Sequence, residues 1–171
     1  MSKLKQFVAV LMGSDSDLGT MQGCVDVLAK LDVPCEVHIT SAHRTPEATR
    51  NYVHDAEQRG CAVFIAAAGM AAHLAGAVAA QTTRPVIGVP IDAGPLKGID
   101  ALLSTVQMPA GVPVAGVAIG SAGAKNAGFL AAQMLALADA GLDERLRAER
   151  AINAESVLAK DRALQEKLQS R

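Results

Sequence analysis

Aromatic side chains are scarce in this chain of 171 residues, which contains no Trp, one Tyr and three Phe. Proteins that hold single-stranded nucleic acid stack its bases on aromatic rings, and those that hold duplexes neutralise phosphates with an excess of Lys and Arg. This chain has no such excess, because 16 Lys and Arg face 17 Asp and Glu and leave a formal net charge of -1. We therefore expect no nucleic-acid partner.

Cysteine is sparse as well, and the three that occur, Cys24, Cys35 and Cys61, form no CxxC pair. An odd number of scattered cysteines argues against a disulfide framework and against a zinc site. We expect reduced thiols that fill half-buried positions.

Long hydrophobic runs are absent, although 50% of the residues are hydrophobic. No apolar run reaches the roughly 20 residues that a bilayer-spanning helix needs. The N-terminal sequence MSKLKQFVAVLMGSD meets a turn too early for a signal peptide. We expect a cytoplasmic protein with no membrane association.

Several motifs of cofactor-dependent and metal-dependent enzymes are missing too. No GxGxxG opens the first predicted helix, and neither an HExxH nor a nucleophile elbow occurs. The sequence GSAGAKNAG at 120–128 looks like a phosphate loop, but Lys125 has no Gly before it and no Ser or Thr after it. The chemistry that remains needs no cofactor and no metal.

Short apolar runs alternate with helical patterns along the chain. The runs predict strands at 7–12, 35–40, 62–67, 85–90 and 112–120, and the patterns predict helices at 16–31, 46–60, 71–80, 96–105 and 122–139. Continuous apolar runs are typical of strands buried on both faces, and right-handed crossovers then give a parallel sheet. The sequence thus predicts a single domain, residues 1–171, whose core at about 7–140 is a three-layer α/β/α sandwich of the flavodoxin-like type with five parallel strands.

Two helices carry further expectations. In the first, Leu18, Met21, Val25 and Leu28 recur at intervals of three and four, which predicts one apolar stripe against the sheet. From Gly141 to the end the chain becomes rich in charge, with Leu and Ile at helical intervals, which predicts a C-terminal amphipathic helix. This helix would pack either on its own domain or over a neighbouring subunit.

Three loops follow the first three predicted strands: MGSDSD (12–17), SAHRTP (41–46) and AAAGMAAHLAG (66–76). The carboxyl ends of parallel strands share one edge of the sheet, where ligands of such folds bind. We expect polar side chains of all three loops to converge on one crevice there.

The first two loops offer groups suited to a phosphorylated sugar. Ser14 and Ser16 can hold a phosphate beside backbone amides, and Asp17 can accept from ribose hydroxyls, although Ser and Asp at a helix start are commonly N-caps. In the second loop Ser41 supplies a further hydroxyl and Arg44 can bind a phosphate through two parallel hydrogen bonds.

The imidazole of His43 can exchange a proton near neutral pH, which makes it the candidate catalytic residue. The third loop adds a helix start without large side chains, where backbone amides can approach a carboxylate or carbon dioxide. Its candidate substrate-binding residues are Ala68, Gly69, His73 and Leu74. The remaining histidines, His38 and His54, are interpreted as structural or solvated.

Six motifs in order give the chain a resemblance to a known family. They are VLMGSDSD, SAHRTP, AAHLAG, PVIGVP, LLSTVQMPAGVPVA and NAGFLAAQML, and they span roughly residues 7 to 140. With them the chain resembles the N5-carboxyaminoimidazole ribonucleotide mutases, small bacterial enzymes of purine biosynthesis. The resemblance implies a homo-octamer with sites between subunits. It also implies an isomerase that moves a carboxylate from the exocyclic nitrogen of its ribonucleotide substrate to the neighbouring ring carbon.

The resemblance also implies roles for single residues. It gives the substrate phosphate to Ser14, Ser16, Ser41 and Arg44. It gives the ribose hydroxyls to Asp17 and the proton shuttle to His43. A loop of Gln107, Met108 and Pro109 would close over the site.

Two departures from the family pattern leave alternatives open. Ala67, Met70 and Ala75 stand where mutases have two glycines and a proline, and IDAGPLKG follows GVP in place of a VQS-type segment. One alternative is a direct carboxylase of aminoimidazole ribonucleotide that uses carbon dioxide, or a pyridinium-carboxylating relative; the latter carry an extra N-terminal region, for which 171 residues leave no room. The other is a flavodoxin-like nucleotide-binding module without catalysis, which would not need His43.

Overall fold

The computed structural model describes residues 6–170. Its elements follow one another as β1 (Phe7–Met12), the short 3-10 helix η1 (Asp15–Asp17), α1 (Leu18–Lys30), β2 (Cys35–Ile39), α2 (Pro46–Gln58), β3 (Cys61–Gly69), α3 (Leu74–Ala79), β4 (Val86–Ile91), α4 (Ile99–Val106), β5 (Ala115–Gly116), α5 (Gly120–Ala136) and α6 (Ala140–Gln169).

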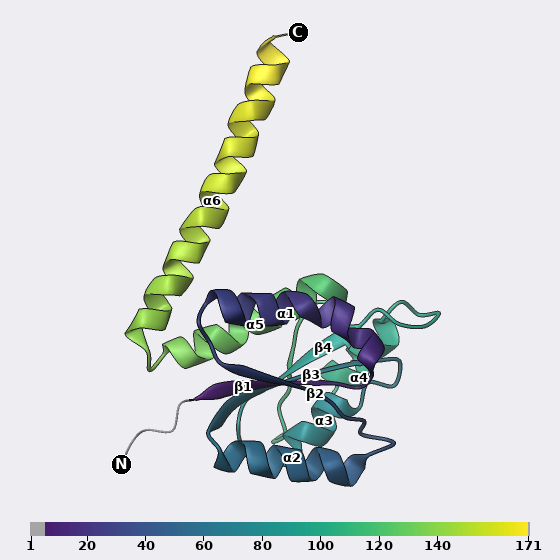
Figure 1. Ribbon diagram of the computed structural model, residues 1–171. Coiled ribbons are helices and arrows are strands. Elements are labelled where there is room, and N and C mark those ends of the chain that lie inside the picture. The colour runs from purple at the N-terminus through teal and green to yellow at the C-terminus, as the bar shows by residue number, and fades with distance from the viewer. Residues whose placement is uncertain (1–5, 171) are drawn as a thin grey trace.

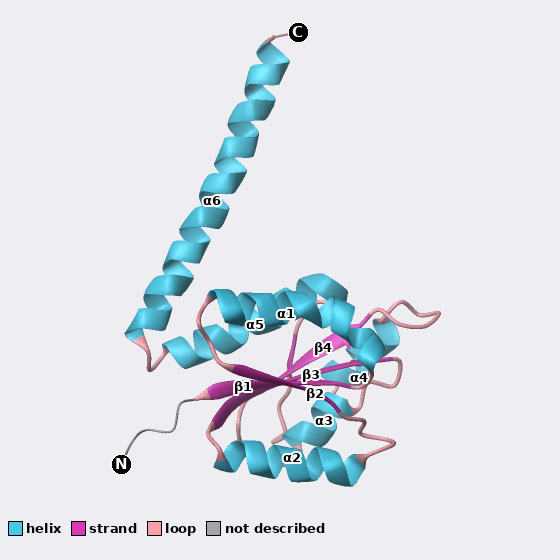
Figure 2. Ribbon diagram, in the orientation of Figure 1, coloured by secondary structure: helices cyan, strands magenta, loops and turns pink. Residues whose placement is uncertain are grey.

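The five strands form one parallel sheet in the order β2-β1-β3-β4-β5. Helices α1 and α5 cover one face, and α2 and α3 cover the other (Figure 1). This strand order is that of flavodoxin-like folds, whose ligands bind beyond the carboxyl ends of the strands. The predicted three-layer α/β/α sandwich is confirmed, with the sheet in the middle layer (Figure 2).

The core is divided between the two faces of the sheet because successive side chains of a strand point in opposite directions. On β1, Val8 and Val10 pack with α1 and α5, whereas Ala9 and Leu11 pack with α2 and α3. Small residues let the layers approach closely. A Cβ atom at Gly128 in α5 would lie 3.0 Å from the backbone oxygen of Cys24 in α1.

Two strands differ from the expectation of long, fully buried runs. Strand β2 lies at the edge of the sheet with only β1 beside it, so its last three residues are exposed. Strand β5 is two residues long instead of spanning 112–120. Pro113 has no N–H to donate to β4, and the N–H of Val112 instead donates to Pro109 within a turn, so pairing begins only at Ala115.

The predicted stripe on α1 is wrong at one end. Leu18 is 46% exposed and Val25 is only partly buried, whereas Met21 and Leu28 are buried together with Cys24 and Val27. The buried face is rotated toward Cys24 because this thiol packs as a small apolar side chain. The expectation of half-buried thiols therefore holds for Cys35 alone, since Cys24 and Cys61 are completely enclosed; all three are unpaired.

Helix α6 begins on the domain and then leaves it. Leu142 is buried, Arg145 donates to the backbone oxygen of Leu31 at 2.9 Å, and Glu149 pairs with Lys30 at 2.6 Å. From residue 151 onward every described residue of the helix is exposed, and the helix extends away from the sheet (Figure 1). Within residues 6–170, none of the helices has the length and apolar character to cross a bilayer.

Candidate functional site

A cavity of about 520 Å³ opens where β1, β2 and β3 end. All ten residues predicted for the site line it: Ser14, Ser16, Asp17, Ser41, His43, Arg44, Ala68, Gly69, His73 and Leu74. Five further residues that the sequence analysis did not assign to the site also line the cavity: Gly13, Ala42, Met70, Ala71 and Ala93. The three loops thus meet in one place, as the parallel sheet requires.

The first loop is closed by reciprocal capping. Ser14 is the N-cap of η1, where its hydroxyl accepts from the N–H of Ser16 at 3.3 Å. The carboxylate of Asp17 accepts in return from the N–H of Ser14 at 3.1 Å. The capping interpretation of Ser14 and Asp17 therefore applies to this structure, and both residues border the cavity at the same time.

Asp17 is the enclosed acid of the cavity, with 7% of its surface exposed. Burial raises the pKa of Asp17 above its ordinary value, the hydrogen bonds from Ser14 and Ser16 lower it in part, and the charge of Asp15 raises it again. A carboxylate of this kind accepts hydrogen bonds from neutral donors such as hydroxyls, which replace part of its lost hydration.

Hydrogen bonds of threonine side chains hold the second loop in place. The hydroxyls of Thr40 and Thr49 lie 2.6 Å apart in a buried hydrogen bond, and Thr45 accepts from the N–H of Ser41 at 3.0 Å. Arg44 then reaches across to the first loop, where its Nη2 donates to the backbone oxygen of Gly13 at 3.3 Å. The guanidinium is exposed and keeps further N–H groups for an anion.

The two histidines of the cavity contact each other. Nε2 of His43 lies 2.7 Å from Nδ1 of His73, and the rings meet edge to face with centroids 4.9 Å apart. The two loops that carry them follow β2 and β3, which lie on either side of β1. The other two histidines lie elsewhere: His38 packs on Tyr52, and His54 is exposed on α2.

The third loop has a strained and crowded backbone. Met70 has a φ of +55°, in the left-handed region that suits glycine, and 56% of its surface is exposed at the cavity. A Cβ atom on Gly69 would lie 2.8 Å from the Cβ of Ala93, so no larger residue fits there without movement. Ala93 follows β4, a strand whose loop the sequence analysis did not assign to the site. The sheet order, which puts β4 beside β3, is the signal that could have indicated it.

The predicted closing loop lies apart from this cavity within one chain. Gln107, Met108 and Pro109 are absent from its lining, and Met108 instead packs near Gly76 of α3.

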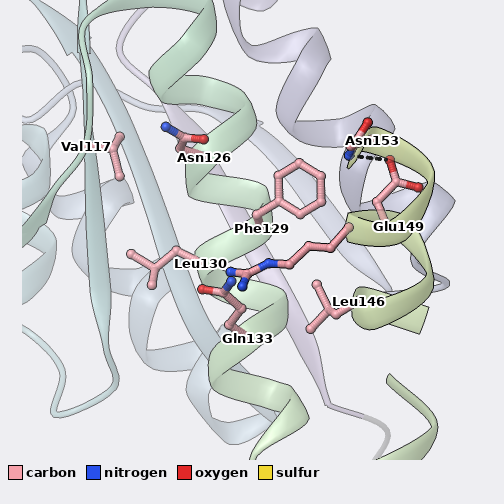
Figure 3. Close-up of a pocket in the computed structure, with 9 residues that line it drawn as sticks. Val117, Asn126, Phe129, Leu130, Gln133, Leu146, Glu149 and Asn153 are labelled. Carbon is pink, nitrogen blue, oxygen red and sulfur yellow. Dashed lines mark hydrogen bonds between the residues drawn. The ribbon is translucent and has the colours of Figure 1, made fainter. Parts of the chain in front are cut away.

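A second cavity of about 410 Å³ lies between α5 and the start of α6. Phe129 and Leu130 of α5 and Leu146 of α6 line it, and Asn153 donates to Glu149 at its rim (Figure 3). It holds no histidine, and α5 and α6 supply most of its lining instead of the three loops after β1, β2 and β3, so the first cavity is the candidate site. No three His, Cys, Asp or Glu side chains of residues 6–170 gather as a possible metal site.

The fold and the cavity together define the class. The chain is a flavodoxin-like α/β protein, and hydroxyls, a guanidinium and two imidazoles line a cavity at the carboxyl edge of its sheet. The sequence model of the family described as AIR carboxylase matches residues 7–156. The chain belongs to this family.

Individual relatives are similar over nearly the whole chain. A protein from Mycobacterium tuberculosis is 55% identical over 158 residues, covering 92% of this chain and 90% of the relative. A protein from Bacillus subtilis is 50% identical over 155 residues, covering 91% and 96%. Both are named N5-carboxyaminoimidazole ribonucleotide mutase. The crystal structure of Treponema denticola PurE superposes with a TM-score of 0.83 at 28% identity and covers 93% of this chain and 98% of that one.

Proposed function

We propose that this protein is an isomerase of purine biosynthesis that converts N5-carboxyaminoimidazole ribonucleotide to 4-carboxy-5-aminoimidazole ribonucleotide. The observation that carries the proposal is the identity of 50% to 55% with proteins named as that mutase over more than nine-tenths of this chain. The cavity adds support, because its side chains match the parts of a ribonucleotide.

The polar rim of the cavity is assigned to the sugar phosphate. The hydroxyls of Ser14, Ser16 and Ser41 donate to phosphate oxygens, and Arg44 adds a permanent charge. Asp17 accepts from the ribose hydroxyls. The segment of Ala68, Gly69, His73 and Leu74 faces the reacting base, with Gly69 leaving the backbone open to the carboxylate.

His43 carries the proton in the proposed mechanism. In the first step the carbamate C–N bond breaks, its electron pair returns to the exocyclic nitrogen, and His43 gives that nitrogen a proton while carbon dioxide forms. In the second step the ring carbon attacks carbon dioxide, and His43 takes the proton that this carbon loses. The imidazole recovers the proton it gave, and the mechanism requires that carbon dioxide stays close to the ring carbon between the steps.

A comparison of two substrates tests the reaction. Purified protein is incubated with the N5-carboxylated ribonucleotide, or with aminoimidazole ribonucleotide and bicarbonate, at low bicarbonate. We expect turnover of the first and little of the second. Turnover of aminoimidazole ribonucleotide with bicarbonate alone would favour the direct carboxylase over the mutase. Turnover in neither incubation would favour a binding module.

His43→Asn tests the shuttle. We expect kcat to fall by about 10²-fold or more because a positioned acid or base supplies about that much. KM should stay within about threefold, since the groups assigned to the phosphate are untouched. The control is His54→Asn, on the exposed face of α2. Retained turnover of His43→Asn would remove this residue from the mechanism.

The proposed mutase function extends to the oligomeric state of the protein and to its place in the cell. The proposed active form is a homo-octamer with sites between subunits in the cytoplasm, where unpaired thiols such as Cys24 and Cys61 persist. Exposed apolar side chains support the assembly. They lie just before α4 (Leu96), on α4 (Ile99 and Leu103) and on α6 (Val157 and Leu164). A neighbouring subunit would then supply the loop of Gln107, Met108 and Pro109 that one chain holds away from its own cavity.

A further inference from the structure

The contact between the two cavity histidines limits how many protons they hold. Nε2 of His43 and Nδ1 of His73 lie 2.7 Å apart, a hydrogen-bond distance that needs an N–H on one ring and a lone pair on the other. If both rings were doubly protonated, two N–H groups would face each other and the bond would be lost. The bonded pair therefore carries at most one added proton.

The partner of His43 is unusual for a catalytic imidazole. Such a ring is commonly oriented by a carboxylate or a backbone carbonyl, neither of which exchanges protons near neutral pH. Among the described residues the other charged groups that line the cavity are Asp17 and Arg44. The carboxylate of Asp17 accepts from Ser14 and Ser16, and the guanidinium of Arg44 donates to Gly13, so the hydrogen-bond partner of His43 is His73.

We propose that His73 is a positioning residue that fixes the orientation of His43 and shares its proton during carboxyl transfer. The proposal rests on the proposed function and deepens it. The pair begins with one added proton and becomes neutral when His43 protonates the exocyclic nitrogen. It regains the proton when the ring carbon releases it. Between these events either ring can keep the remaining N–H in the shared hydrogen bond.

Two substitutions of His73 separate proton sharing from simple orientation. His73→Asn places an amide near the former Nδ1, so it can still hydrogen-bond His43 but cannot take up a proton. His73→Ala removes both abilities. Proton sharing predicts that both variants lose at least about tenfold in kcat with KM within about threefold. The matched control, His54→Asn, keeps the wild-type kcat.

A kcat of His73→Asn equal to that of the wild type would overturn the proposal, because orientation alone would then suffice. Circular dichroism checks that each variant is folded; both are expected to fold because His73 is exposed. Absence of turnover in the wild-type protein would instead remove the proposed function, so the two failures are distinguishable.

A measurement without substrate tests the pair directly. The chain has four histidines, so ¹⁵N NMR of the imidazoles resolves a small set of signals during a pH titration. We expect the signals of His43 and His73 to change together in two linked steps in the wild-type protein. In His73→Asn, His43 should titrate in one step. Independent single-step titration of the two rings in the wild type would contradict proton sharing.

Discussion

At the scale of single residues, Arg44 is the permanent cation of the cavity. The hydrogen bond from its guanidinium to the backbone oxygen of Gly13 is long, at 3.3 Å, so a phosphate would offer the guanidinium better acceptors. We expect Arg44→Ala to raise KM by about tenfold to 100-fold with a smaller change in kcat, because a charged hydrogen bond contributes about 1.5–3 kcal/mol. Arg44→Lys keeps the charge without the planar fork and should lie between. An unchanged KM in steady-state assays would argue against the phosphate role.

Cys24 makes the folded protein sensitive to alkali. Burial raises the pKa of its thiol from 9.0 to about 12, and the nearby Cys35 adds to the shift. Between these values the unfolded chain has lost the proton while the folded chain keeps it, so stability falls as the pH rises above about 9. We expect a loss of up to about 1.4 kcal/mol per pH unit from this thiol.

Urea unfolding at pH 8 and pH 10 under reducing conditions measures the effect. Cys24→Ala should unfold with a smaller difference between the two pH values than the wild type, although its stability at pH 8 is lower because a cavity remains. An equal difference in both proteins would mean that Cys24 makes no contribution.

The lining of the cavity was predictable where polar side chains follow the end of a strand. His43 and Arg44 follow β2 directly, and topology alone carries them to the same edge as Ser14. The contact between His43 and His73 was not predictable, because it depends on ring orientations across two loops. Nor was the place of Met70 in the lining, which depends on its left-handed backbone.

At the scale of elements, α6 depends on a cap at the point where the chain leaves α5. The carboxylate of Asp139 accepts from the N–H of Leu142 at 3.0 Å. We expect Asp139→Ala to lower the free energy of unfolding by about 1 kcal/mol, because the N–H of Leu142 at the helix start would lose its hydrogen-bond acceptor. Asp139→Asn, which retains an acceptor, should lose only a fraction of that. Denaturant melts of the three proteins would contradict the role if Ala and Asn behaved alike.

Strand lengths show where element prediction stops. Buried β4 matches its predicted run closely, because every residue from Val86 to Ile91 is enclosed. In contrast, VPVAGVAIG at 112–120 is equally apolar and yields only two paired residues. Apolar composition predicts burial, but pairing also requires an N–H and a neighbouring edge within reach, and Pro113 lacks the first.

At the scale of the whole molecule, the apolar face by which α6 packs on the domain extends into the part of the helix that leaves the domain. Leu142 and Leu146 contact the core, and at helical spacing Val157 and Leu164 follow on the same side, 66% and 51% exposed. An exposed apolar stripe on a helix without neighbours is suited to burial against another copy of the chain. This observation favours the second of the two interpretations of the C-terminal helix for its distal part.

Charge on this stripe tests the assembly. We expect the wild-type protein to have eight times the chain mass of 17.6 kDa in light scattering, and Val157→Lys with Leu164→Lys to form smaller species. The control Ala159→Lys lies on the opposite side of α6 and should keep the full mass. Val157 and Leu164 are exposed in one chain, so the double variant should still fold. An undiminished mass of the double variant would exclude this face from the interface.

The sequence by itself determined the alternation of strands and helices, the parallel sheet and the three loops at its edge, because these follow from local periodicity and from the handedness of crossovers. That the whole chain is one domain stays a prediction. Only the tertiary structure decided the rotation of the buried face of α1, the shortness of β5, and the pairing of His43 with His73. Each of these depends on atoms brought together from distant parts of the chain, where close packing and hydrogen-bond geometry select one arrangement among several that the local sequence allows.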